Sequence, residues 1–117
     1  MRVTSDLWVS ALIRRVFSAG GFAAIMRRGA AEAGAIFILS RTRLGEVMLF
    51  GPAPQVDYDT ARPDERFFTP LSADEDMAAI EARLAKETRF DPDIWVVEIE
   101  IGVIPVEDLI VVRSGPL

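Results

Sequence analysis

One stretch, residues 34–54, constrains the fold more than any other part of the chain. It contains two apolar runs, Ala35–Leu39 and Val47–Phe50, which are joined by the polar segment Ser40–Glu46. Both runs are rich in β-forming residues, and Gly51-Pro52 ends the second run, so they predict a long antiparallel hairpin. Because neither run alternates apolar with polar residues, both strands are expected to be central in their sheet and covered on both faces.

The segment before this hairpin has the pattern of an amphipathic helix. Apolar residues recur at helical spacing on one face from Trp8 to Phe17. Gly20-Gly21 then supplies a stop signal. The pattern predicts a helix over about residues 6–19.

A second helix is predicted after the sequence Ser72–Glu75, which matches a capping box. Met77, Ile80 and Leu84 then recur at helical spacing. The helix is expected to end near Thr88, since a proline follows shortly afterwards and disfavours helical geometry in the residue before it.

The remaining segments complete an α+β pattern. Strands are predicted at Phe22–Arg28, Arg66–Leu71 and Ile94–Ile101, with a further β-rich piece at Asp108–Val112 and an acidic loop at Gln55–Glu65. This order predicts two layers, with both helices on one face of a mixed, mainly antiparallel sheet of about five strands. We expect a single domain over residues 1–101 and a C-terminal extension over 102–117, with its β-rich piece as a candidate edge strand.

Composition removes several classes of function. The chain has 117 residues, enough for one domain, and it contains neither cysteine nor histidine. Disulfides, thiolate or imidazole metal sites, a cysteine nucleophile and a Ser-His-Asp triad are therefore excluded. No apolar run approaches the roughly 20 residues of a membrane span, and no signal peptide is evident, so a cytoplasmic location without membrane contact is expected.

Charge is distributed unevenly along the chain. Residues 1–43 contain seven arginines against two acidic residues, whereas the whole chain has a formal net charge of −5. This asymmetry predicts one basic and one acidic face, unless folding mixes the two halves. The overall acidity argues against non-specific nucleic-acid binding, which depends on neutralising phosphates.

Four arginines form a candidate anion-binding cluster. Arg14-Arg15 and Arg27-Arg28 are adjacent pairs, and guanidinium groups suit phosphate and carboxylate ligands. The structural alternative is that these side chains are solubilising charges paired with the acidic half of the chain. The glycine spacing matches neither a phosphate loop nor a dinucleotide-binding fingerprint.

A second candidate site is the proline-rich exit from the hairpin. Gly51, Pro52 and Pro54 would stiffen the backbone and present Gln55 and Tyr58 to a peptide or small ligand. The structural alternative is a rigid strand terminator. The acidic groups of the chain lack the spacing of a calcium-binding loop, so no metal site, cofactor or catalytic residue is predicted.

Four stretches carry a resemblance to a known family. They are WVSALIRR (8–15), RRGAAEAGAIF (27–37), LFGPAPQ (49–55) and RFDPDIWVVEIE (89–100). In this combination the chain resembles a family of short bacterial proteins catalogued only as a domain of unknown function. The resemblance implies a small cytoplasmic bacterial domain and brings no activity, cofactor or catalytic residue with it.

The leading hypothesis is a non-enzymatic binding module that meets a protein partner through a sheet edge, the proline-rich turn and the acidic loop. The alternative is a small enzyme or anion-binding domain that uses the arginine cluster for a phosphorylated or carboxylated ligand. We also expect Leu109–Val112 to be ordered and to pair with a sheet edge, either its own or that of a second copy in a homodimer.

Overall fold

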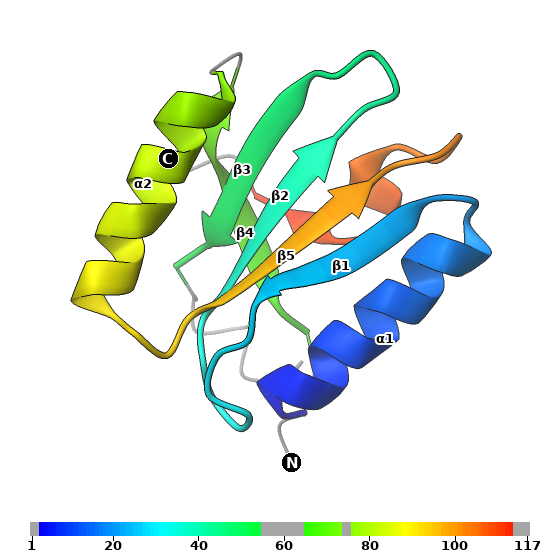
Figure 1. Cartoon of the computed structure of the whole chain (residues 1–117). Coiled ribbons are helices and arrows are strands. Elements are labelled where there is room, and N and C mark those ends of the chain that lie inside the picture. The colour runs from blue at the N-terminus through cyan, green and yellow to red at the C-terminus, as the bar shows by residue number, and fades with distance from the viewer. Residues whose placement is uncertain (1–2, 55–64, 74–75, 114–117) are drawn as a thin grey trace.

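The computed structural model describes residues 3–54, 65–73 and 76–113. Two helices and a six-stranded sheet make up this part of the chain (Figure 1). In chain order the elements are α1 (Ser5–Ser18), β1 (Phe22–Arg27), β2 (Ile36–Arg41), β3 (Val47–Pro52), β4 (Phe67–Ala73), α2 (Met77–Phe90), β5 (Trp95–Glu100), the 3-10 turn η2 (Val106–Asp108) and β6 (Val111–Val112).

The strands are ordered β1-β5-β2-β3-β4-β6 across the sheet. The pairs β1–β5, β2–β3 and β3–β4 are antiparallel, whereas β5–β2 and β4–β6 are parallel. The predicted α+β class and mixed sheet are confirmed. The sheet has one strand more than expected and a larger parallel share, because β5 lies between β1 and β2 and because β6 adds beside β4.

The predicted hairpin is confirmed as the centre of the sheet. Every residue from Ile36 to Ser40 is buried. Successive side chains of a strand point to opposite faces. Accordingly, Ile36 and Ile38 enter the core on the α1 side, while Phe37 and Leu39 enter a separate core on the α2 side.

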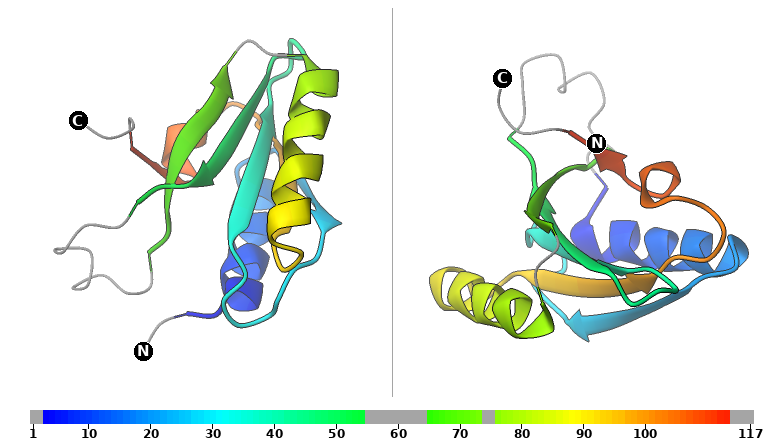
Figure 2. Two further views of the ribbon diagram at one scale, coloured as in Figure 1. Left: turned by 90° about the vertical axis from the view of Figure 1, so that its left-hand side faces the viewer. Right: turned by 90° about the horizontal axis from the view of Figure 1, so that it is seen from above.

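The placement of both helices on one face was wrong. The helices lie on opposite sides of the sheet, so the molecule has three layers (Figure 2). A central strand that is apolar on both faces must be covered on both, and one helix covers each side. The same pattern that predicted doubly buried strands therefore required this arrangement.

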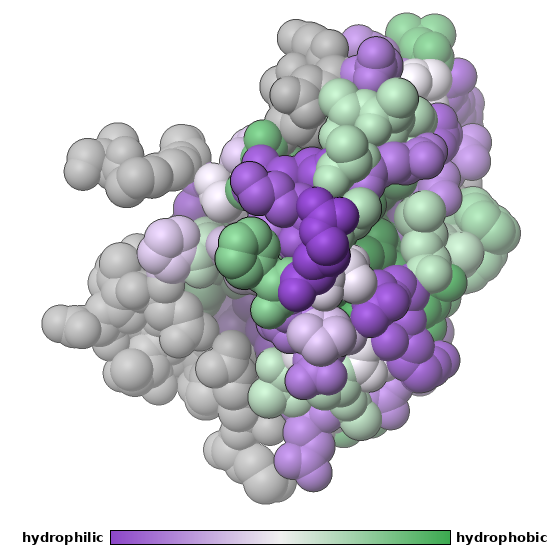
Figure 3. Space-filling model, turned by 60° about the vertical axis from the view of Figure 1, so that its left-hand side comes forward, coloured by the Kyte–Doolittle hydropathy of each residue, from purple (hydrophilic) through white to green (hydrophobic). Residues whose placement is uncertain are grey.

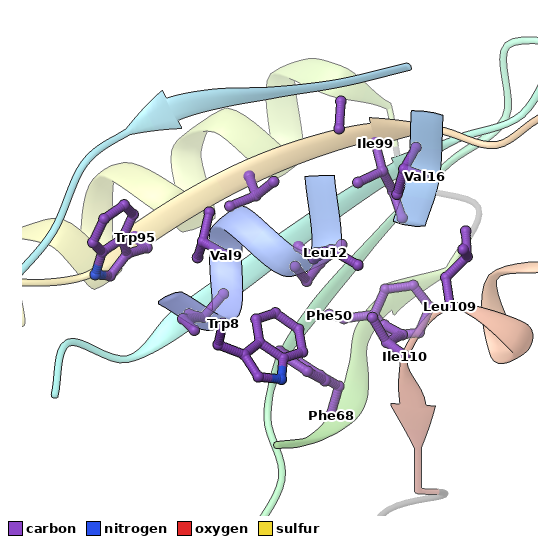
Figure 4. Packing of buried hydrophobic residues seen from close by; sticks show 14 residues of the cluster. Trp8, Val9, Leu12, Val16, Phe50, Phe68, Trp95, Ile99, Leu109 and Ile110 are labelled. Atoms are coloured by element: carbon purple, nitrogen blue, oxygen red, sulfur yellow. The ribbon is translucent and has the colours of Figure 1, made fainter. Parts of the chain in front are cut away.

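The larger core lies between α1 and the sheet (Figure 4). Leu12 and Val16 are completely buried there, and Trp8 packs on Phe68 with ring centroids 5.4 Å apart. Burial of each such large apolar side chain stabilises the fold by about 1.5–3 kcal/mol. The indole nitrogen of Trp95, also enclosed, donates to the Ala30 carbonyl at 2.8 Å.

Helix α2 begins later than the capping box predicted. Its N-cap is Asp76, whose carboxylate accepts a hydrogen bond from the Ala79 amide at 2.8 Å. Ser72 and Ala73 remain paired with β3 as part of β4, so their backbone is extended. The expected helix N-cap at Ser72 was wrong, because Ser72 and Ala73 pair with β3 and are therefore part of a strand.

The C-terminal segment packs against the main core. Leu109 and Ile110 are buried on the α1 side, after the turn η2. β6 then runs parallel to β4, with Val111 aligned to Phe67. No described helix is both long enough and apolar enough to cross a membrane.

Candidate functional site

One edge of the sheet is the six-residue strand β1. At the opposite edge, the two-residue strand β6 pairs with only Phe67 and Phe68 of the seven-residue strand β4. β1 pairs with β5 on one side only, and within the described ranges no strand lies beyond it. An open strand of this kind presents backbone groups that another chain can pair with.

The hydrogen bonds of β5 show which backbone groups point outward. The amides of Trp95 and Ile101 donate to the carbonyls of Ala35 and Arg41, so the odd-numbered residues of β5 face β2. Successive residues of a strand direct their N–H and C=O groups to opposite sides. The even-numbered residues of β5 therefore face β1.

The free backbone groups of β1 belong to its odd-numbered residues. Ala24 is aligned with Glu98, so its backbone groups face β5. Those of Ala23 and Ile25 consequently face away from the sheet. No hydrogen bond to them is present among the described residues.

Apolar side chains accompany this open edge. Phe22 is 53% exposed and Met26 is 49% exposed, at the two ends of β1. Phe22 lies edge-to-face against Phe17 of α1, with ring centroids 5.6 Å apart. We call the outer side of β1, together with Phe17, the β1 edge. The β1 edge combines unpaired backbone with exposed apolar surface.

A tight turn holds α1 against the start of β1. Gly20 has φ +85°, a conformation that favours glycine. The following residue, Gly21, donates to the Val16 carbonyl at 2.9 Å. A Cβ atom at Gly21 would lie 2.5 Å from the Glu100 carbonyl oxygen, so this position also requires glycine. These constraints fix the position of Phe22, the first residue of β1, relative to the end of α1.

Charged residues lie at both ends of β1. Glu100 is exposed and aligned with Phe22, whereas Arg27 and Arg28 follow at the other end. Arg28 forms an exposed ion pair with Asp6 at 3.4 Å. Its guanidinium carbon also lies 5.2 Å from the centre of a Trp95 ring. Arg27 donates to the Pro92 carbonyl, between the exposed Asp91 and Asp93, so the arginine end of β1 contains charges of both signs.

A groove of about 470 Å³ lies between α1 and the C-terminal segment. Leu7, Trp8 and Val111 contribute apolar walls, and Arg15 and Arg66 contribute guanidinium groups. Arg15 donates to the Leu109 carbonyl at 3.1 Å, and Arg66 donates to the Val3 carbonyl at 2.7 Å. Both contacts fasten chain segments together, which gives these arginines a structural role.

The proline-rich exit of β3 borders a smaller hollow of about 270 Å³. Pro52 and Pro54 are exposed, and Ala53 between them donates to the Phe67 carbonyl at 2.8 Å. A Cβ atom at Gly51 would lie 2.6 Å from the Leu71 side chain. The exit is therefore held closely against β4. The predicted site residues Gln55 and Tyr58, like most of the acidic loop, lie outside the described residues.

The four predicted arginines separate into two groups. Arg14 and Arg15 lie in the second half of α1, and Arg15 reaches the C-terminal segment. Arg27 donates to the Pro92 carbonyl at 2.6 Å, near the start of β5, and Arg28 contacts the start of α1. No contact joins the two groups in the described part of the chain. A shared role in anion binding stays a prediction.

The other described surfaces have fewer features of a binding site. On the side shown in Figure 3, hydrophobic areas are small and separated by hydrophilic residues. Leu44 and Phe90 are highly exposed, but they lie apart, at the hairpin tip and at the end of α2. Residues 3–54, 65–73 and 76–113 contain no group of three or more acidic side chains that could hold a metal ion.

The sequence did not indicate which strand would form an open edge. The expected pairing of Leu109–Val112 with a sheet edge is found within the chain, where Val111 and Val112 pair with β4, and β1 is left as an outer strand. One signal for β1 was available: Phe22–Met26 is an apolar segment without a charged residue. The segment alone could not reveal whether a neighbour covers its outer side.

The family comparison agrees with the resemblance in the sequence. A family model described as "Protein of unknown function (DUF1491)" matches residues 3–104. No curated protein matches the chain.

Solved structures of bacterial proteins share the fold along most of the chain. The solution structure of protein Atu0922 from A. tumefaciens is 49% identical, covers 99% of this chain and 98% of its own, and superposes with a TM-score of 0.83. A crystal structure of a DUF1491 family protein from Caulobacter crescentus is 38% identical, with coverage of 84% and 87% and a TM-score of 0.71. An NMR structure of a DUF1491 family protein from C. crescentus is 34% identical, with coverage of 97% and 99% and a TM-score of 0.77.

Proposed function

The chain belongs to the DUF1491 family of proteins of unknown function, and we propose that it is a non-enzymatic protein-interaction module. The proposed docking surface is the β1 edge, and the proposed ligand is an extended segment of a protein. One observation carries the proposal: the outward backbone groups of Ala23 and Ile25 lie between the exposed side chains of Phe22 and Met26. The proposed location is the cytoplasm, because the chain contains no cysteine and so cannot form the disulfides that are typical of secreted domains.

Strand addition explains how this surface would bind. An extended segment laid along β1 can exchange main-chain hydrogen bonds with Ala23 and Ile25, and such bonds supply affinity in this mode of recognition. The flanking Phe22 and Met26 would contact alternate side chains of the segment. Aromatic residues and methionine are enriched at protein interfaces, because they bury a large apolar area.

The opposite sheet edge is a weaker candidate. β6 consists only of Val111 and Val112, and very short edge strands are one way in which proteins limit unwanted pairing. Arg113 also donates through its amide to the Phe68 carbonyl at 2.7 Å, which continues the pairing past the strand's end. The part of β4 that β6 leaves uncovered contains Pro70, which has no amide to donate to a ladder, so this edge is less suited to strand addition.

The arginine-based alternative has no comparable support. Arg15 and Arg27 donate to backbone carbonyls, and Arg28 pairs with Asp6. An anion site would need two or more guanidinium groups that converge on one hollow. The contacts of these side chains instead join segments of the fold.

The test compares two variants of the full chain in extracts of the organism that encodes it. Phe22→Lys/Met26→Lys places charge along β1, whereas Leu44→Lys places a charge at a side chain that is 88% exposed and lies outside β1, in the turn between β2 and β3. We expect wild type and Leu44→Lys to retain a stoichiometric protein partner, and the double variant to lose it. Hydrogen exchange of the purified complex should show protection of the Ala23 and Ile25 amides.

Two results would contradict the proposal. One is that the wild-type chain captures no stoichiometric protein, neither another protein nor a second copy of itself. The other is capture that is equal in both variants, with the Ala23 and Ile25 amides unprotected. Circular dichroism should establish first that both variants are folded.

A further inference from the structure

We infer that the partner of the β1 edge is a second copy of the chain, paired antiparallel across a two-fold axis at Ala24. The inference rests on the proposed function and names the occupant of the same surface. The two sheets would join through β1 into one continuous sheet. Such an interface is isologous, so one surface must be complementary to itself.

The backbone of β1 has the required self-complementarity. Ala23 and Ile25 both direct their backbone groups outward. When Ala23 of one copy lies opposite Ile25 of the other, each of these pairs can exchange two hydrogen bonds. Ala24 then lies opposite Ala24 of the other copy as a non-hydrogen-bonded pair, with Cα atoms about 4.5 Å apart.

The side chains fit the same register. Phe22 comes opposite Met26 of the other copy, which gives an aromatic and apolar cross-strand pair on each side of the axis. These side chains are about half-exposed in the single chain, so pairing would remove apolar surface from water. The small Ala24 side chains at the axis leave room for the close approach of two strands.

A bulge limits the length of the pairing. The alignment of β1 with β5 shifts between Ile25 and Arg27, at Met26. Bulges bend a strand and disrupt its ladder, so regular backbone pairing would be limited to Ala23–Ile25, with Phe22 and Met26 flanking it. A short interface of this kind predicts an association that depends on protein concentration.

Self-association can be measured by sedimentation equilibrium over a range of concentrations. The wild-type chain should approach twice its mass of 12.9 kDa as concentration rises. Leu44→Lys should match wild type, and Phe22→Lys/Met26→Lys should weaken association at least tenfold. A wild-type chain that stays monomeric at all concentrations, or a double variant that associates equally well, would overturn the inference.

A single cysteine tests the register directly. The chain has no cysteine, so Ala24→Cys can form a disulfide only between copies. The expected separation of about 4.5 Å falls within the range of roughly 4.4–6.8 Å found for disulfide-linked Cα atoms. Ala24→Cys should form a covalent dimer at least tenfold faster than Leu44→Cys under the same mild oxidation. Equal rates would reject pairing at Ala24.

The two proposals can fail separately. A monomeric chain whose capture of a different protein is abolished by Phe22→Lys/Met26→Lys would reject the second copy as occupant and retain strand addition as the function. If neither another protein nor a second copy protects the Ala23 and Ile25 amides, both proposals fail.

Discussion

Leu12 has no solvent-accessible surface, because α1 directs it into the core against the sheet. Leu7 lies on a different face of the same helix and is 62% exposed, where it lines the groove between α1 and the C-terminal segment. The two residues have the same chemistry and the same helix propensity. Their difference in burial alone should therefore set the difference in their contribution to stability.

Leu12→Ala should lower the free energy of unfolding by about 2–5 kcal/mol, because it removes buried methyl groups and leaves a cavity. Leu7→Ala should change it by less than about 0.5 kcal/mol, as is usual for surface substitutions. Urea denaturation followed by circular dichroism measures both values. Similar losses in the two variants would show that α1 does not pack with the observed face inward.

Helix α2 illustrates how an element's boundary is decided. The sequence offers Ser72–Glu75 as a capping box, but the pairing of Ala73 with Met48 keeps the chain extended there. The helix begins at the next suitable cap, Asp76. Its outer face carries an Arg83–Glu87 ion pair at 2.9 Å. Ion pairs of this spacing on a helix surface stabilise the helix only modestly.

Asp76→Ala should lower the free energy of unfolding by about 1 kcal/mol, since the Ala79 amide loses its acceptor. Glu81→Ala, at an exposed position inside the same helix, provides the matched loss of a carboxylate and should cost little. Thermal and urea denaturation compare the two. An equal effect would mean that the general loss of negative charge, and not the cap, governs the result.

At the level of the complete chain, the C-terminal segment closes the core. Leu109 and Ile110 are 8% and 3% exposed and pack with residues of α1 and the sheet. Arg15 of α1 also donates to the Leu109 carbonyl, so the segment is held by both apolar and polar contacts. The division into a domain over residues 1–101 and an extension over 102–117 stays a prediction, which truncation can test.

Deletion of residues 103–117 should lower Tm, because it uncovers the core beneath Leu109 and Ile110. Burial of such side chains contributes about 1.5–3 kcal/mol each, a large part of the stability of a small domain. Leu109→Ala should reproduce part of the loss, while Val103→Ala, at a position that is 81% exposed, should not. Differential scanning calorimetry measures the three Tm values. An unchanged Tm after truncation would make the segment a passive extension.

Only part of the proposed site could be predicted from the sequence. The apolar segment Phe22–Met26 predicted a strand, and its lack of charge was visible. Whether a strand is an edge depends on which strands pair beside it, and these are distant in sequence: β1 pairs with β5. The arginine pairs were equally visible, yet their contacts with Pro92, Asp6 and Leu109 arise only when distant segments meet.

The sequence by itself determined the features that depend on neighbouring residues. These include the helical period around Leu12, the glycine-terminated turn at Gly20-Gly21 and the hairpin with its doubly apolar strands. The tertiary structure decided that β5 enters between β1 and β2, that the helices cover opposite faces and that β1 remains open. The physical reason is that periodicity and turn chemistry act over a few residues, whereas strand order and helix placement minimise exposed apolar surface over the entire chain.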